Sequence, residues 1–523
     1  MNDLLNNDKE STLQYGHWQS LSPIAIVYFA ISTIKHSIGN FVYLAPALIA
    51  GYSTLKENPL LASVGLLVLI SLPVGYGALS FLLYRFRLSD SSVEVRSGVF
   101  SKKHLNLPFE RIQNVKFEQP IYYRLFGYSC IELDTAGSSG KEAKIVALPT
   151  SDAVLLKEQI LSYAHHDSSA HNDKSVDAGS STDKKQTSDE EILNTRSISD
   201  LVIHGLTSNR VWIILAALAP FYDNITTELA SWMNTLGVDV ETLFNPATRS
   251  MWQLIAFFIA VTLAIVVFMT LLSVLGAIFM FYGFTLSKSR ERYIQRSGLI
   301  TKREISMKVS RVQIAVRKQD WLDSILGRIN LVFEQKSVTP QQGDAVMSMQ
   351  QKLTIPSVKL DECHQLIDDA MPDNQMRELS YHPINKRFIS RNILFRLFPP
   401  FIIFMGIITF QQQYTALAVS GLALAICSAL IALRWKRWGF QIDQQFLYIR
   451  KGLFGIDYYC VPIFKIQQTL YRQSVFMKRL KLANVEFVLA SGLVSIPFVP
   501  QEMATKLVNN ALYRVESDQR SWM

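Results

Sequence analysis

The sequence predicts a membrane protein of mixed α and β structure, with six transmembrane helices in three hairpins. Each hairpin is followed by a small antiparallel β-barrel or sandwich with a C-terminal helix. The 523 residues are too many for one ordinary domain. Hydrophobic residues make up 49% of the chain and charged residues 18%, a balance that suits apolar spans alternating with soluble domains. One set of residues also recurs three times at a fixed spacing.

The charge distribution indicates an anionic membrane face as the partner and no nucleic acid. The formal net charge is +9, and Lys and Arg crowd the ends of the apolar runs. None of the four cysteines belongs to a Cys-x-x-Cys pair, so we expect a reducing compartment without disulfides, metal site or cofactor. They are Cys130, Cys363, Cys427 and Cys460.

Three apolar runs reach the roughly 20 residues that a helix needs to cross the hydrocarbon. They are residues 59–83, 252–281 and 416–433. Each run ends in a basic cluster, so the positive-inside rule places all three C-terminal ends in the cytoplasm. The clusters are Arg85 and Arg87; Lys288, Arg290 and Arg292; and Arg434, Lys436 and Arg437.

Three spans in one direction require a return span before each of them. We assign the returns to residues 41–52, 211–222 and 393–410, with amphipathic lead-ins around Lys35 and over residues 197–210. Alternatively, one return is a buried soluble helix; the second is short and contains a proline. We predict six spans with both termini in the cytoplasm.

The repeat consists of three copies that match without gaps around a glycine. Gly98, Gly298 and Gly452 start the match; thirteen positions later stand Arg111, Arg311 and Lys465; fifteen positions later stand Gln113, Gln313 and Gln467. Between the hairpin and a closing helix, each copy alternates or is β-branched, which predicts short strands. Near the end, each copy has an apolar residue before proline, aligned as Leu148-Pro149, Ile355-Pro356 and Ile496-Pro497.

The repeat divides the chain into a polar tail, three hairpins, three β-rich domains and one linker. The tail is 1–20, the hairpins are 21–84, 193–283 and 373–433, and the β-rich domains are 85–164, 284–372 and 434–516. The linker, residues 165–192, is nearly all polar and is predicted to be disordered.

The paired span, the glycine, the Arg-x-Gln step and the later Gly127 or Gly327 together resemble the bacterial pleckstrin-homology-like (PH-like) domain family of YdbT-type multi-repeat membrane proteins. The resemblance implies a strongly bent antiparallel sheet closed by a C-terminal helix, and brings no catalytic residues. It also implies a short single-unit relative as a hetero-oligomer partner. Copy three departs from the pattern with Lys465 and Lys481.

The candidate binding residues fall into two groups. The Arg/Lys-x-Gln pairs lie on one face of a strand, where they would bind an acidic headgroup or a partner strand. In the alternative, the glutamine satisfies backbone groups and the basic side chain lies along the sheet. The second group is a basic pair after the glycine, with a solvated turn as its alternative: Lys102 and Lys103, matched by Lys302 and Arg303. Copy three has Ile456 and Asp457 there.

We therefore predict a non-enzymatic, multi-pass scaffold of the bacterial inner membrane. Its PH-like domains would face the cytoplasm for protein assembly or lipid-headgroup binding. The alternative is a transport or export component, or a factor for tolerance of membrane-active peptides. The three strong spans contain no Asp or Glu, which counts against an ion pump. An enzyme would need a cleft of ionisable groups that the sequence does not assemble.

Overall fold

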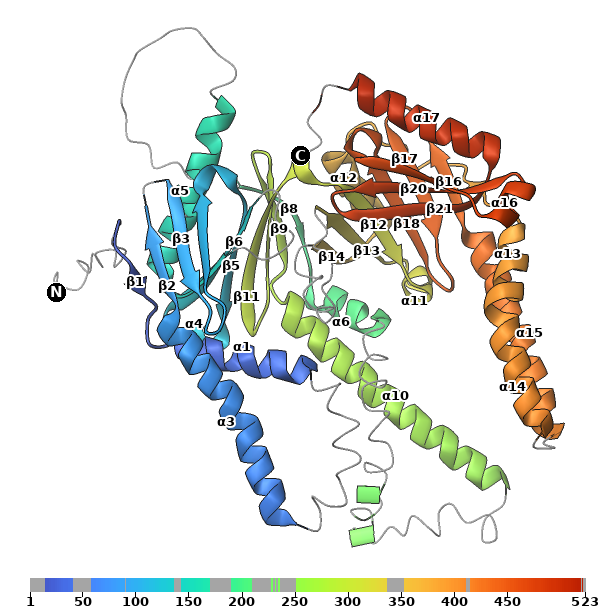
Figure 1. The fold of residues 1–523 in the computed structure, drawn as a ribbon, viewed down its shortest axis with the longest axis horizontal. Helices are drawn as coiled ribbons and strands as arrows, with labels where there is room; N and C mark the ends of the chain where they lie inside the picture. The colour runs from blue at the N-terminus through green and yellow to red at the C-terminus, as the bar shows by residue number, and fades with distance from the viewer. Residues whose placement is uncertain are drawn as a thin grey trace. The chain divides into compact units, whose positions relative to one another are not determined.

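The computed structural model forms two compact units, Met1–Met307 and Lys308–Met523 (Figure 1). It describes residues 15–40, 58–89, 91–135, 143–169, 190–208, 227–228, 231, 234–235, 251–335, 352–410, 414–518 and 520. Each unit is described by itself below. The mixed α and β composition and the several antiparallel sheets that the sequence predicts are confirmed.

The three strong apolar runs are all helical. They form α3 (Pro59–Leu83), α10 (Met251–Phe281) and α15 (Tyr414–Arg437). A proline starts α3, where its missing N–H costs nothing, and three basic residues end α15, where they complement the carbonyl end of the helix.

Three helices within the described residues are long and apolar enough to cross a membrane. They are Ile259–Phe281, Arg387–Thr409 and Val419–Arg437. The second contains the expected return span of hairpin three and is built from α13 (Arg387–Asn392), the π-helix η6 (Ile393–Leu397) and α14 (Phe398–Phe410). The expected returns at 41–52 and 211–222 lie outside the described residues, so six spans remain a prediction.

The lead-in segments form helices that cross the membrane helices at glycines. In hairpin one, α1 (Ala25–Asn40) meets α3 at Gly77, where an added Cβ would lie 3.0 Å from the Ala30 nitrogen. In hairpin two, α6 (Ile198–Thr207) meets α10, and the Ser273 hydroxyl donates a 2.6 Å hydrogen bond to the Gly205 carbonyl. Small residues at both crossings allow the backbones to approach closely.

A strand that precedes each hairpin joins the sheet that follows the hairpin. These strands are β1 (Gln19–Ser20), β8 (Glu190–Thr195) and β15 (His382–Pro383), and they pair with β2 (Arg85–Leu88), β9 (Thr285–Ser289) and β16 (Gly439–Ile442). Each hairpin is therefore an insertion within a domain. The predicted boundaries after residues 20, 192 and 372 do not separate these strands from the tail, the linker and the hairpin.

The predicted linker 165–192 is also too long at both ends. The helix α5 (Thr150–Ser169) continues through its first residues, and β8 begins at Glu190. Residues 170–189 lie outside the described part of the chain.

The strands of each copy divide into a first group that ends at a short 3-10 turn and a second group that follows it. The first groups add β3 (Ser92–Ser97) and β4 (Lys103–Pro108); β10 (Arg292–Ser297) and β11 (Thr301–Lys308); β17 (Phe446–Lys451) and β18 (Ile456–Pro462). The second groups are β5 (Ile112–Pro120), β6 (Tyr128–Thr135) and β7 (Ala143–Pro149); β12 (Ile314–Gln319), β13 (Ile329–Glu334) and β14 (Lys352–Val358); β19 (Gln468–Arg472), β20 (Leu482–Leu489) and β21 (Gly492–Pro500). The closing helices are α5, α12 (Leu360–Ala370) and α17 (Gln501–Ser517).

Neighbouring copies share a sheet, which the prediction of one barrel or sandwich per copy did not include. In the first unit, seven strands follow the order β7-β6-β5-β11-β10-β9-β8, so the second group of copy one continues into the first group of copy two. In the second unit the order is β14-β13-β12-β18-β17-β16-β15, with copies two and three in the same roles. The sheet β1-β2-β3-β4 begins the series and β19-β20-β21 ends it.

The repeated glycine is required by its backbone. Gly98 and Gly298 have φ angles of 107° and 112°, and an added Cβ would lie 2.0 Å from the carbonyl oxygens of Ser101 and Thr301. The same distance separates it from the Gly455 oxygen at Gly452. A tight turn before the third strand of each first group explains this part of the sequence pattern.

A bulge in the last strand of each copy corrects the proline alignment. Ala147, Ser357 and Phe498 have φ angles of 54°, 51° and 54°, and each lies in the bulged part of β7, β14 or β21. The strand registers make Ile145, Ile355 and Ile496 equivalent, because they pair with Ile131, Leu331 and Val485. Leu148-Pro149 therefore lies three residues later than the Ile-Pro steps of copies two and three.

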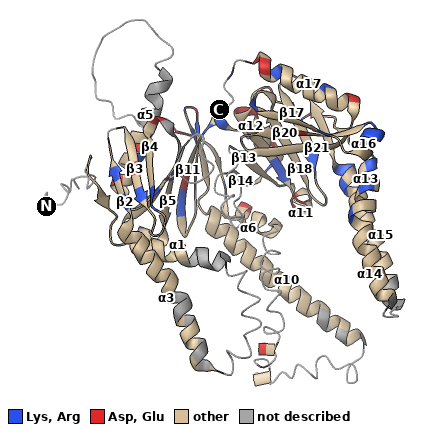
Figure 2. Cartoon of the chain, viewed as in Figure 1, with Lys and Arg blue, Asp and Glu red and all other residues tan. Residues whose placement is uncertain are grey.

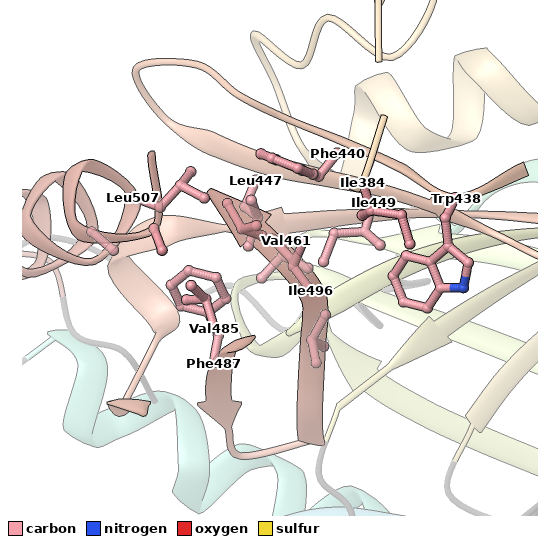
Figure 3. Close-up of a cluster of buried hydrophobic side chains, with 14 of the residues drawn as sticks. Ile384, Trp438, Phe440, Leu447, Ile449, Val461, Val485, Phe487, Ile496 and Leu507 are labelled. Atoms are coloured by element: carbon pink, nitrogen blue, oxygen red, sulfur yellow. The ribbon is translucent and has the colours of Figure 1, made fainter. Parts of the chain in front are cut away.

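The core of copy three packs the two strand groups against α17 (Figure 3). Leu447, Ile449 and Val461 face Val485, Phe487 and Ile496, with Leu507 from the helix. The base of hairpin three joins the same core through Ile384 and Trp438, and the Trp435 indole donates a 2.8 Å hydrogen bond to the Ile384 carbonyl. Burial of these side chains fixes the hairpin to its domain.

Candidate interaction site at the strand junctions

The first junction is the antiparallel pairing of β5 in copy one with β11 in copy two. Its register runs from Thr301 opposite Pro120 to Ile305 opposite Lys116, with Arg303 opposite Glu118. Backbone pairing of this kind is how a separate strand adds to an open sheet edge. Here both strands belong to one chain.

Charged side chains connect the strands around the first junction. The Arg303 Nε lies 3.6 Å from Glu118, and the Lys144 ammonium lies 2.7 Å from the same carboxylate. Lys116 and Glu132 are buried and lie 3.2 Å apart. Burial alone would lower the pKa of Lys144, but Tyr28 and the carboxylates of Glu118 and Glu132 raise it overall. The ammonium therefore stays charged in this network.

A second set of ion pairs connects the closing helix of copy one to the strands of copy two. Lys157 on α5 pairs with Glu304 on β11, and Arg296 lies 3.0 Å from Glu304. Arg296 also pairs with Glu190 on β8 at 2.7 Å. This hydrogen-bonded arginine lowers the pKa of Glu190. Copy one thus contacts copy two through both a strand and a helix.

The second junction pairs β12 of copy two with β18 of copy three in the same register as the first. Copy two follows copy one by 200 residues, and copy three follows copy two by 154, measured between the repeated glycines. On this numbering the pair Lys318–Asp457 is equivalent to Glu118–Arg303, and the two residues are again directly opposite each other. The charge pair is kept, but its sign is reversed.

Close packing accompanies the second junction. The Arg317 guanidinium lies 4.7 Å from the centre of the Tyr458 ring, its partner in the register. At Gly455, an added Cβ would lie 2.6 Å from the Gln319 carbonyl oxygen and 2.7 Å from the Asp320 Cα. The glycine therefore allows β18 to approach β12.

The lysine of the third Lys-x-Gln pair binds the backbone of copy two. The Lys465 ammonium donates hydrogen bonds of 2.5 Å to the Ser310 carbonyl and 2.6 Å to the Val312 carbonyl. These carbonyls belong to η4 (Val309–Arg311) and the residue after it, and Lys465 ends the equivalent turn η7 (Ile463–Lys465). Burial, with a smaller contribution from Arg520, lowers the pKa of Lys465 to about 8.

The other members of the Arg/Lys-x-Gln group lie at the start of each second strand group. Gln313 is buried and Gln467 is exposed, and their backbone N–H groups donate equivalent 2.8 Å hydrogen bonds to Glu334 and Val488. Arg311 is half-buried at the end of η4. The side chains of Arg111 and Gln113 lie outside what the structure describes. A headgroup role for this group remains a prediction.

The basic pairs lie in different settings in copies one and two. Lys102 and Lys103 are exposed, and Lys103 begins β4. Lys302 and Arg303 lie within β11 at the first junction, opposite Gln119 and Glu118. Sequence reasoning missed the junction itself, although opposite charges at equivalent positions of successive copies were a usable signal.

The described residues contain no group of three His, Cys, Asp or Glu side chains that could hold a metal ion. The strand groups, closing helix and membrane hairpin define a class of membrane protein built from PH-like units. The Bacterial PH domain family matches the chain three times, over residues 41–164, 238–370 and 393–515, so the chain belongs to that family.

The chain is also similar to a curated protein over most of its length. It is 20% identical over 485 residues to the UPF0699 transmembrane protein YdbT of Bacillus subtilis (strain 168), covering 89% of this chain and 91% of that protein. No solved structure matches the chain. Together with the apolar helices, these similarities make the chain a membrane protein with three bacterial PH domains.

Proposed function

We propose that this chain is a non-enzymatic scaffold of the bacterial inner membrane. Its PH-like domains lie in the cytoplasm and bind a partner protein by strand addition. The observation that carries the proposal is the shared sheet: at both junctions, a second strand group is completed by the first group of the next copy in one register.

Two strands are left over by this arrangement. The strand β4 is the counterpart of β11 and β18, and β19 is the counterpart of β5 and β12. Within the described part of the chain, β4 and β19 each pair on one side only. An edge strand offers unpaired backbone groups to another chain, so these two edges are the natural docking sites.

The charge at the repeated position favours a different protein over a second copy. Each internal junction places opposite charges there, whereas the outer edges carry Lys103 on β4 and Arg472 on β19. Head-to-tail pairing of two copies would place these like charges opposite each other, which disfavours that assembly. Arg472 is already paired with Glu486 at 3.2 Å, so we place the partner on β4.

The partner is therefore a strand edge of a PH-like protein with a carboxylate opposite Lys103. The probe is a labelled peptide of residues 112–120, the native β5 strand, with a matched peptide carrying Glu118→Lys. Full-length chain in nanodiscs should bind the native peptide several-fold more tightly, and a Lys103→Glu chain should reverse the preference. Absence of binding to either peptide would overturn the proposal.

A crosslinking experiment tests the second copy as the occupant. In the shared register Leu105 would face Leu470, so one chain carries Leu105→Cys and a differently tagged chain carries Leu470→Cys. We expect no intermolecular disulfide in membranes. A disulfide at this pair, absent from a Leu105→Cys and Leu489→Cys control, would make self-assembly the function of the edge.

A further inference from the structure

The base of hairpin three contains a polar cavity that the scaffold proposal does not use. The cavity measures about 210 Å³, and Arg391, Asn392, Arg396 and Asn484 line it together with aromatic side chains. An adjoining cavity of about 180 Å³ shares Asn392 and Arg396 and adds Arg434. Both lie where the helix Arg387–Thr409 begins and Val419–Arg437 ends.

The π-helix η6 gives this site its shape. It lies between α13 and α14, and it contains Arg396 while Arg391 and Asn392 precede it directly. A π-turn changes the angle between successive side chains, and such turns occur frequently at functional sites. The Asn392 amide donates a 2.7 Å hydrogen bond to the Phe388 carbonyl, which holds that side chain beside the cavity.

Acidic residues are absent from this stretch of the sequence. Between Glu378 and Asp443 the chain has no Asp or Glu but seven Lys and Arg residues. Figure 2 shows Lys and Arg along α13. The positive-inside rule accounts for basic residues at the ends of spans, but it does not account for a cavity between them that asparagine amides also line.

The chemistry of the cavity fits a phosphate group on an apolar anchor. Arginine binds phosphate oxygens through paired N–H groups, and amide groups add neutral donors. The walls next to these donors are apolar: Phe395 is largely exposed, and Leu397 and Ile431 line the adjoining cavity. A free phosphate ion would use the donors but not these walls.

We propose that this cavity binds the phosphate of an anionic phospholipid, with Arg391 and Arg396 as the main contacts and Arg434 at its edge. The acyl chains would follow the exposed apolar surface of the two helices. The inference is independent of strand docking at β4, and its test does not use that edge. It also differs from the headgroup site predicted at Lys102 and Lys103.

The test measures retention of phosphatidylglycerol and phosphatidylcholine by the purified full-length chain in detergent, using native mass spectrometry. We expect preferential retention of phosphatidylglycerol, reduced about fivefold by Arg391→Gln and by Arg396→Gln, because each basic residue near an anionic lipid contributes a factor of about this size. Arg387→Gln is the matched control, since it removes a charge from the same helix outside both cavities. Thermal unfolding confirms that each variant is folded, and Arg396→Lys should retain most of the binding.

Each other outcome rejects the proposal. Equal retention of the two lipids would remove the phosphate as the recognised group. An equal loss in Arg387→Gln would reduce the effect to general charge. Inorganic phosphate that displaces the lipid and stabilises the chain equally well at the same concentration would make the cavity an ion site.

Discussion

Arg303 on β11 and Glu118 on β5 face each other across the first junction, with 3.6 Å between the guanidinium Nε and the carboxylate. The equivalent residues of the second junction, Asp457 and Lys318, face each other with the charges exchanged. A strand taken from one junction would therefore meet a like charge at the other. The position encodes which copy pairs with which, as charge patterns do at other specific interfaces.

Exchanging the first pair tests this rule. Arg303→Glu places two carboxylates together, and we expect it to destabilise the chain by about 1 kcal/mol, a modest value because the pair is partly exposed. Glu118→Arg should cost more, since it also removes the partner of Lys144. The double variant should recover part of the loss in thermal unfolding of the detergent-solubilised chain, with a coupling energy of at least about 0.5 kcal/mol. Strict additivity would contradict the rule.

The sequence predicted the elements better than their pairing. Apolar length identified α3, α10 and α15, and the spacing from Gly98 to Arg111 identified the copies, because both signals are local. The shared sheets depend on contacts between residues about 185 positions apart, such as Arg303 and Glu118, for which one copy alone contains no signal. The two-residue strands β1 and β15 are too short to show alternation.

The candidate site was predicted in part. Lys465 was chosen for its repeated position, and the structure gives it two backbone carbonyls as partners. The cavity at Arg391 and Arg396 was not predicted, because it requires a π-turn and a strand from a distant part of copy three. Proline alignment failed in copy one because the bulge at Ala147, and not the proline, is the repeated feature.

Gly455→Val should weaken the second junction. The added Cβ would lie 2.6 Å from the Gln319 carbonyl oxygen, so β18 must move away from β12, at a cost of about 1–3 kcal/mol. Hydrogen exchange should increase in β12 and β18. Gly406→Ala is the control, because its Cβ would meet no atom within 4 Å. Unchanged protection in both strands would contradict the pairing.

Lys465→Met should destabilise the chain by about 1–3 kcal/mol, because the Ser310 and Val312 carbonyls lose their buried donor. The loss should depend on pH. The folded-state pKa of about 8 lies below the ordinary lysine value, so between about pH 8 and 10 the unfolded chain holds a proton that the folded chain has released. Stability relative to the Met variant should therefore rise with pH through this window. A flat or falling difference would contradict the assignment.

The predicted orientation can be tested with single cysteines and a membrane-impermeant maleimide. Burial raises the pKa of Cys130 to about 11 and that of Cys363 to about 12, and Cys460 is also buried, so these thiols should react little at neutral pH. On intact cells Asn234→Cys should be labelled, whereas Ser101→Cys should be labelled only after permeabilisation. The reverse pattern would place the PH-like domains outside.

The three bulge residues predict a stabilising substitution. Ala147 holds a φ of 54°, a left-handed conformation that costs a residue with a side chain about 1 kcal/mol and costs glycine nothing. Ala147→Gly should therefore raise the unfolding free energy by up to about 1 kcal/mol, less the small contribution of one buried methyl group.

Ala143→Gly in the same strand is the matched control, since Ala143 is also buried but is not among the residues with positive φ. It should destabilise the chain through added backbone freedom and the lost methyl group. Both variants are compared by thermal unfolding in the same detergent. If they lower stability equally, the backbone at Ala147 is not strained, and the bulge is a matter of register alone.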